Sequence, residues 1–189
     1  MVNSSCCPGD TVTTIASLEL VKLVINSVLS HRGAKFAWFD AANFYMGNPL
    51  DHLEYVKIKI ANISQEFINE YKLTQYDHNE FIHFDISKGV YSLPQSGRLS
   101  NDHLCTCLEK EGYYETTITP GLWRQKCHPI LFSLIVDYFG VEHVIKCHSN
   151  HLALVIQQYH TIKIDWEGKK YAGIDLAWNY TNPNFCLTM

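Results

Sequence analysis

Asp137 is the residue of this chain whose surroundings most strongly suggest chemistry. It interrupts an apolar run over residues 129–141, and Tyr138 follows it directly. An unpaired buried carboxylate carries a large desolvation penalty, so a carboxylate in such a run needs something to bind. The simplest arrangement is a β-hairpin over residues 130–137 and 139–145 whose tip presents Asp137 to a cation or a substrate.

A second acid, Asp40, ends another predicted strand over residues 35–40, roughly a hundred positions earlier. Taken singly, each of these two aspartates reads as an ordinary loop or cap residue. Two carboxylates side by side on adjacent strands repel each other unless they share cations, and Mg²⁺ with phosphate oxygens is the usual solution. The sequence therefore predicts that Asp40 and Asp137 form a Mg²⁺-binding catalytic pair of the two-metal kind.

The elements that must position this pair follow from periodicity. Helical spacing predicts helices, and alternation of apolar and polar residues predicts strands. We expect helices over residues 13–30, 64–71, 97–111 and 149–159, the last with Ser149 as N-cap, and strands over residues 54–60 and 80–86. A second hairpin is expected from residues 162–166 and 171–180 around a turn at 167–170. This order indicates a mixed α+β fold, an antiparallel sheet with helices packed on one face, of the split βαβ type.

Composition sets the class of protein. The chain has 189 residues, 47% hydrophobic and 18% charged, with a formal net charge of −4, which fits one globular domain without a strongly basic surface. The start has neither a basic nor an apolar signal region, and residues 18–29 are too short and polar to span a bilayer. We therefore expect an intracellular protein, cytoplasmic or nuclear, with no membrane contact. Protein partners and oligomeric state are left open.

The seven cysteines are expected to be reduced thiols. Cys105, Cys107 and Cys147, with His148 and His151, could form a zinc site, but their spacing fits no standard ligand pattern. The alternative, small buried thiols and surface histidines, is preferred.

Four stretches in order carry a family resemblance. They are residues 36–50, continued by 51–55, then 88–102, 135–138 and 171–180, supported by residues 119–124. The first three resemble polymerase motifs A, B and C, and the fourth resembles the segment that follows motif D and supports the primer. Over about residues 11–182 the chain resembles the reverse transcriptase domain of Ty1/copia-type retrotransposons. Residues 1–10 and 183–189 are then expected to be tails.

The resemblance implies a polymerase palm-like fold with partial fingers and RNA-directed DNA polymerase activity. The partners would be an RNA or DNA template-primer and deoxynucleoside triphosphates, and the cofactor Mg²⁺. Asp40 and Asp137 would ligate the metals, and the backbone carbonyl of Ala41 would help to bind the metal of the incoming triphosphate.

The resemblance also implies three substrate contacts. Tyr45 would lie beneath the sugar and exclude a 2′-hydroxyl, although an aromatic residue at this position could equally be part of the core. Gln95 and Gly97 would form the turn and helix start near the templating base pair, and the alternative for Gly97 is an ordinary turn glycine.

Tyr138 departs from the family pattern, which has a second aspartate at this position. A phenol with a pKa of about 10 stays neutral at pH 7 and is a poor Mg²⁺ ligand. We therefore expect polymerase activity to be weak or absent, and the alternative function is a non-enzymatic retrotransposon remnant that acts as a binding or inert palm-like domain. Slow turnover with Asp137 alone stays open.

Other family parts are also not seen. Before Asp40 the only basic residues are Lys22, Arg32 and Lys35, without a clear triphosphate-binding motif. We find no sequence expected for a thumb or a ribonuclease H domain, so processive synthesis is not expected.

Overall fold

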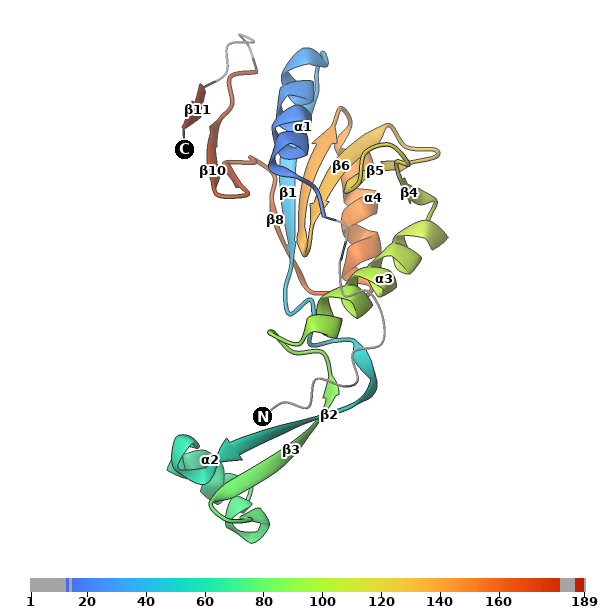
Figure 1. The fold of residues 1–189 in the computed structure, drawn as a ribbon. Coiled ribbons are helices and arrows are strands. Elements are labelled where there is room, and N and C mark those ends of the chain that lie inside the picture. The colour runs from blue at the N-terminus through green and yellow to red at the C-terminus, as the bar shows by residue number, and fades with distance from the viewer. Residues whose placement is uncertain (1–12, 14, 181–185, 189) are drawn as a thin grey trace.

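The computed structural model describes residues 13, 15–180 and 186–188, and Figure 1 shows their arrangement. The fold is mixed α+β with antiparallel sheets, as the sequence predicts. The tail predicted over residues 1–10 lies outside the described residues. Of the second predicted tail, Cys186–Thr188 forms strand β11.

A six-stranded sheet forms the centre of the molecule, in the order β4-β5-β6-β7-β1-β8. All neighbouring strands are antiparallel. The strands are β1 (Lys35–Ala41), β4 (Tyr113–Glu115), β5 (Leu122–Gln125), β6 (Ile130–Ile135), β7 (Tyr138–His143) and β8 (Ile162–Asp165).

Two helices connect the four strands at one side of this sheet. Helix α3 (Pro94–Lys110) lies between β1 and β6 in the chain, and α4 (Lys146–Gln157) lies between β7 and β8. Because β7 lies between β1 and β6, and β1 lies between β7 and β8, both crossovers are split βαβ units. This arrangement brings the end of β1 beside the β6–β7 hairpin.

Helices cover both faces of the sheet, so the prediction of helices on one face was wrong (Figure 1). Phe36 of β1 packs in a cluster with α1 (Leu18–Ser30), whereas Phe39 packs in a second cluster with residues of α3 and α4. Both faces of β1 are therefore apolar, which is typical of a strand buried between two layers. The alternation expected of a half-buried strand is absent, and this is the signal that α1 covers the second face.

The N-termini of α1 and α4 show how local sequence determines where a helix begins. Ser17 is the N-cap of α1 and accepts a hydrogen bond from the Leu20 amide at 3.2 Å, so the helix begins at Leu18 and the predicted start at residue 13 was five residues too early. Helix α4 begins at Lys146, and Ser149 is a fully buried residue inside it rather than its N-cap. The predicted cap at Ser149 was therefore wrong, because the helix already starts one turn earlier at the end of β7.

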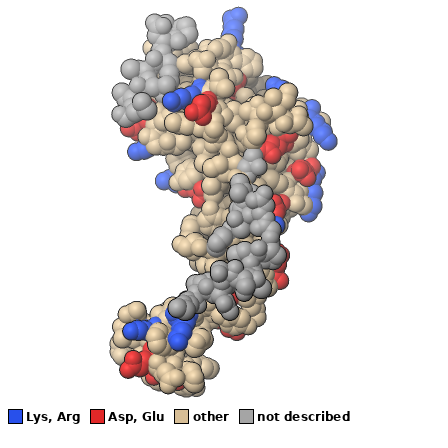
Figure 2. Space-filling model, in the orientation of Figure 1, with Lys and Arg blue, Asp and Glu red and all other residues tan. Residues whose placement is uncertain are grey.

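A two-stranded arm projects from the main body (Figure 1). It consists of β2 (Pro49–Lys59) and β3 (Phe81–Lys88), with η1 (Ile60–Asn62), α2 (Gln65–Glu70) and η2 (Leu73–Tyr76) at its tip. A small cluster around Ile68, Leu73 and Ile82 stabilises the tip. Basic and acidic side chains are interspersed on the face shown in Figure 2, in agreement with the small net charge.

The C-terminal strands form a separate three-stranded sheet of β9 (Lys170–Tyr171), β10 (Ile174–Ala177) and β11 (Cys186–Thr188). The predicted hairpin of residues 162–166 with 171–180 was wrong, because β8 pairs with β1 while β9 pairs with β10. Asp165 explains the change of direction: its carboxylate accepts hydrogen bonds from the Glu167 and Lys169 amides at 2.9 and 3.0 Å, which turns the chain out of the main sheet.

Within the described residues, no helix is both long and apolar enough to cross a membrane.

Candidate functional site

Asp40 lies one residue before the end of β1, in the middle of a cross-strand row. Its direct partners are Tyr138 on β7 and Lys163 on β8. Partners in an antiparallel register point to the same face of the sheet, so a carboxylate, a phenol and an ammonium group share one face here. Tyr138 is thus the immediate neighbour of Asp40.

Asp137 lies in the turn of the β6–β7 hairpin, whose last paired residues are Ile135 and Tyr138. The other turn residue, Val136, has a φ of 55°. A positive φ at the first loop residue is what a type II′ hairpin turn requires, but a β-branched residue adopts it only with strain. Nothing in the sequence marks Val136 as a strained position, so this feature of the turn was not predicted.

One backbone hydrogen bond fastens the turn to β1. The Ala41 amide donates to the Asp137 carbonyl at 3.0 Å, and the Ala41 side chain is fully buried. The peptide that follows Asp40 therefore contacts the residue that carries the second carboxylate. The structure brings Asp40, Ala41 and Asp137 together, as expected from adjacent strand ends.

The two carboxylates influence each other electrostatically. Burial raises the pKa of Asp137 above its ordinary value, the Asp40 charge adds to that rise, and a backbone hydrogen bond opposes it. The Asp40 charge is also the largest cause of the raised pKa of Tyr138, which stays a neutral phenol at pH 7. Negative potential is therefore concentrated at this corner, where a cation would relieve it.

Tyr45 lies next to this corner. Burial is the main cause of its raised pKa, followed by the charge of Asp137 and by Tyr91. The Tyr45 and Tyr91 rings meet edge to face with centroids 5.0 Å apart, and Tyr91 also influences Tyr138. Tyr91 therefore belongs to the site, although sequence reasoning assigned it no role; its only signal was its place in the stretch that includes Gln95 and Gly97.

Gly97 and Gln95 diverge in the structure. A Cβ atom at Gly97 would lie 3.9 Å from Cε1 of Tyr45, so the first turn of α3 packs against that ring. Gln95 instead donates from Nε2 to Oε1 of Glu54 on the arm, at 2.6 Å. Gln95 thus connects α3 to β2, and the geometry places only Gly97 beside Tyr45.

Gly89 is a further residue that sequence reasoning missed. A Cβ atom there would lie 2.5 Å from the Tyr45 carbonyl oxygen, so no larger residue fits without moving the backbone. The Gly89 amide donates to the Asn48 carbonyl at 2.9 Å. The segment after β3 is therefore held directly against the segment that carries Tyr45.

The donor set of this corner suits one Mg²⁺ better than a pair. Mg²⁺ in proteins is commonly held by one or two carboxylates and completes its shell with water and phosphate oxygens. Asp40 and Asp137 supply that number, and the part of the chain that the structure describes contains no group of three or more His, Cys, Asp or Glu that could hold a metal. Tyr138 occupies the direct neighbour position from which a third carboxylate would reach the site.

A pocket of about 430 Å³ adjoins Tyr138 on the same side of the sheet. Trp38 and Tyr171 line it together with two cations, Lys163 and Lys170. Lys35, one of the basic residues that sequence reasoning considered, is the first residue of β1, at the end of the strand remote from Asp40. Lys163, the direct partner of Asp40 on β8, and Lys170 on β9 both follow the motif C stretch in the chain, whereas the basic residues that sequence reasoning considered precede Asp40.

The alternative zinc site finds little support in the structure. Cys105 and Cys107 lie on α3, while Cys147 is exposed at the start of α4. His148 instead meets His128, with their Nδ1 atoms 2.7 Å apart.

Neither family models, nor curated proteins, nor solved structures gave a match to this chain.

Proposed function

We propose that this chain is a palm-type domain of the Ty1/copia reverse transcriptase kind whose Mg²⁺ site is disabled by Tyr138. The observation that carries the proposal is the register of β1 and β7: Asp40 lies directly opposite Tyr138, with Asp137 in the turn next to it. At this place the resemblance expects two carboxylates besides Asp40, at residues 137 and 138, and Tyr138 has a phenol in place of the second.

The topology supports the palm assignment. The split βαβ sheet brings the end of β1 to the β6–β7 hairpin, and α3 follows the arm so that Gly97 packs on Tyr45. This topology brings Asp40 and Asp137, which are far apart in the sequence, to the same end of the sheet, and the proposal requires a phosphate polymer to reach them there. The cations Lys163 and Lys170 beside the Trp38 and Tyr138 rings suit such a polymer.

Asp40 and Asp137 are the residues that would hold Mg²⁺, whose chemistry in such a site is to neutralise charge that develops on phosphate oxygens. Tyr45, beneath an incoming nucleotide, would restrict the sugar, and Gly97 would allow the backbone to approach the base pair. A template-primer and deoxynucleoside triphosphates are accordingly the proposed ligands.

Tyr138 removes one carboxylate and adds bulk. Metal stabilisation of the transition state is worth several kcal/mol, and each ~1.4 kcal/mol changes the rate tenfold, so loss of proper metal binding lowers the rate by about a hundredfold or more. We expect no primer extension above background from the parent protein. A palm-like domain that binds without catalysing is the alternative that this same residue favours.

The test is a Tyr138→Asp variant, assayed for Mg²⁺ binding by calorimetry and for extension of an oligo(dT) primer on a poly(A) template with Mg²⁺ or Mn²⁺. Restoring the carboxylate is expected to raise Mg²⁺ affinity at least about tenfold, because a charged oxygen ligand replaces a neutral one. Tyr138→Phe is the matched control, since it removes the hydroxyl without adding charge. Asp40→Asn in the Tyr138→Asp background should abolish the gain.

Three results bear on the proposal separately. Robust extension by the parent would show that Tyr138 does not disable the site. An unchanged Mg²⁺ affinity in Tyr138→Asp would overturn the metal site itself. Restored Mg²⁺ binding without extension would favour the binding domain over a polymerase with a single defect.

A further inference from the structure

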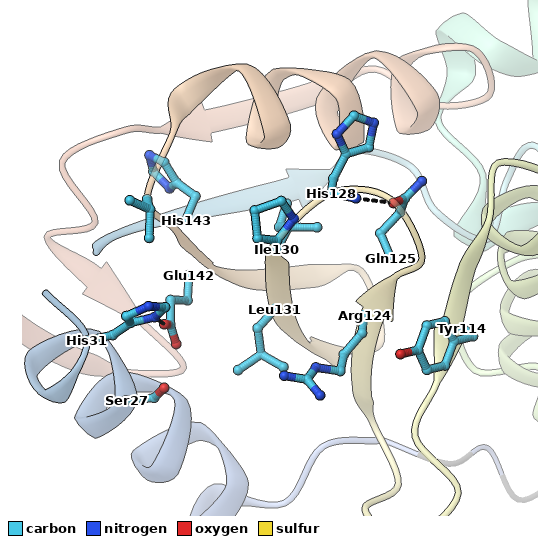
Figure 3. A pocket seen from close by; sticks show the side chains of 12 residues that line it. Ser27, His31, Tyr114, Arg124, Gln125, His128, Ile130, Leu131, Glu142 and His143 are labelled. Atoms are coloured by element: carbon cyan, nitrogen blue, oxygen red, sulfur yellow. Dashed lines mark hydrogen bonds and ion pairs between the residues drawn. The ribbon is translucent and has the colours of Figure 1, made fainter. Parts of the chain in front are cut away.

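A second pocket, of about 270 Å³, opens between α1 and the end of the main sheet remote from Asp40 (Figure 3). One cross-strand row forms its floor: Tyr114, Arg124, Leu131 and Glu142 are direct neighbours on β4, β5, β6 and β7. Glu142 pairs with Phe36, four residues before Asp40 on β1, so the two sites are separated by roughly 13 Å along the strand.

The row carries opposite charges on the two sides of Leu131. Arg124 and Glu142 are both neighbours of Leu131, so an apolar side chain separates a cation from an anion by two strand spacings, roughly 10 Å between Cα atoms. Figure 3 shows the Arg124 guanidinium on one side of Leu131 and the Glu142 carboxylate on the other. The Arg124 guanidinium forms no hydrogen bond or ion pair with another residue that the structure describes.

Glu142 is the unusual member of this row. Its side chain is only 7% exposed, and Oε1 lies 3.0 Å from Nδ1 of His31, whose side chain is 61% exposed. Its second oxygen, Oε2, is buried and has no hydrogen-bond partner within the described part of the chain. A buried carboxylate with an unpartnered oxygen costs stability, and a largely exposed histidine compensates little of that cost.

A ligand with a positively charged group would explain why the fold keeps a buried carboxylate that lowers its stability. An ammonium group would satisfy both oxygens of Glu142, and the exposed His31 ring can turn outwards to admit it. A carboxylate at the other end would meet the Arg124 guanidinium, whose planar donors bind such groups in pairs. Leu131, between them, suits a short apolar chain.

We propose that this pocket binds a small zwitterion whose amine and carboxylate are separated by a short apolar chain, that is, an ω-amino carboxylic acid. Glu142 binds the amine in place of His31, Arg124 binds the carboxylate, and Leu131 contacts the methylenes. The proposal is independent of the palm-type function, because none of these residues belongs to the Asp40 corner.

The test is calorimetric titration of the full chain with 6-aminohexanoate, compared with hexanoate and hexylamine. The zwitterion is expected to bind at least about tenfold more tightly than either single-charge analogue, since each charged end adds a charge-assisted contact. Equal binding of hexanoate would reduce the pocket to an anion site and overturn the proposal, as equal binding of hexylamine or no saturable binding of any probe would.

Variants assign the two ends. Arg124→Gln is expected to weaken binding of 6-aminohexanoate at least about tenfold while leaving hexylamine binding unchanged. Glu142→Gln is expected to weaken binding of 6-aminohexanoate by a similar factor while leaving hexanoate binding unchanged. Lys126→Gln, at an exposed position next to the row but outside the pocket, is the matched control. His31→Ala should bind the zwitterion at least as tightly as the parent, so loss of binding there would overturn the exchange of His31 for the ligand amine.

Discussion

Gly140, at the centre of β7, allows the small C-terminal sheet to dock on the main sheet. A Cβ atom at this position would lie 2.6 Å from Cε1 and Cζ of Tyr171 and 2.9 Å from Oγ of Ser133. Both neighbours are buried, and the Tyr171 hydroxyl is hydrogen-bonded to Ser133 Oγ at 3.1 Å. Neither the ring nor the strand backbone can give way cheaply, so Gly140→Ala must displace Tyr171.

The magnitude follows from two costs. Overpacking a well-packed core by one methyl group costs about 1–3 kcal/mol, and a strained or lost Tyr171–Ser133 hydrogen bond adds about 1 kcal/mol. We expect Gly140→Ala to lower the free energy of unfolding by about 2–4 kcal/mol, which for a chain of this length lowers Tm by about 4–16 °C.

Urea unfolding followed by circular dichroism, with a parallel thermal scan, measures this effect. Gly47→Ala is the matched control, because a Cβ atom at Gly47 meets nothing within 4 Å and its φ is not in the left-handed region. The control should change the unfolding free energy by less than about 1 kcal/mol, and the alanine there can even stabilise by restricting the unfolded chain. If the two alanine variants have the same stability, the tight contact between β7 and Tyr171 is refuted.

Two further predictions concern buried polar groups. Burial lowers the pKa of His143 to about 4 from 6.5, so the unfolded chain binds the proton first and stability falls as pH drops from 6.5 towards 4. His143→Gln should flatten this dependence of the unfolding free energy on pH in urea unfolding, whereas His83→Gln, at an exposed position, should not. An unchanged dependence in His143→Gln would contradict the assignment. Ser149 Oγ is buried without a hydrogen-bond partner among the described residues, so Ser149→Ala should leave the unfolding free energy unchanged or raise it by up to about 1 kcal/mol. Ser133→Ala loses the hydrogen bond with Tyr171 and should lower the unfolding free energy by about 1 kcal/mol. If chemical denaturation finds Ser149→Ala the less stable of the two variants, Ser149 has a partner.

Local sequence predicted most elements of the fold but not how they pair. The β6–β7 hairpin and the arm strands were readable because apolar residues alternate or form short runs between turn residues. The partner of β8 was not readable, because Glu167-Gly168-Lys169-Lys170 looks like a hairpin turn while Asp165 uses its carboxylate to redirect the chain. Side-chain hydrogen bonds of this kind leave no periodic signal.

The candidate site divides in the same way. The positions of Asp40 and Asp137 at neighbouring strand ends followed from acids that interrupt apolar runs, and the structure places these residues side by side. Tyr91 and Lys163 could not be found, since one lies in a turn and the other reaches Asp40 only through the β1–β8 register. Pairing between distant strands is a property of the whole sheet, and one sequence does not reveal it.

Strand β7 shows how one element can carry two independent sites. Tyr138, Gly140 and Glu142 are spaced two residues apart on β7, so all three face the same side of the sheet. Tyr138 borders the acidic corner and Glu142 borders the zwitterion pocket, while the ring of Tyr171 fills the space above Gly140 between them. A side chain at residue 140 would take that space, so the glycine both docks the C-terminal sheet and allows a buried aromatic wall to separate the two pockets. The Coulomb interaction between Asp40 and Glu142 is weakened by their separation of roughly 13 Å along the strand direction.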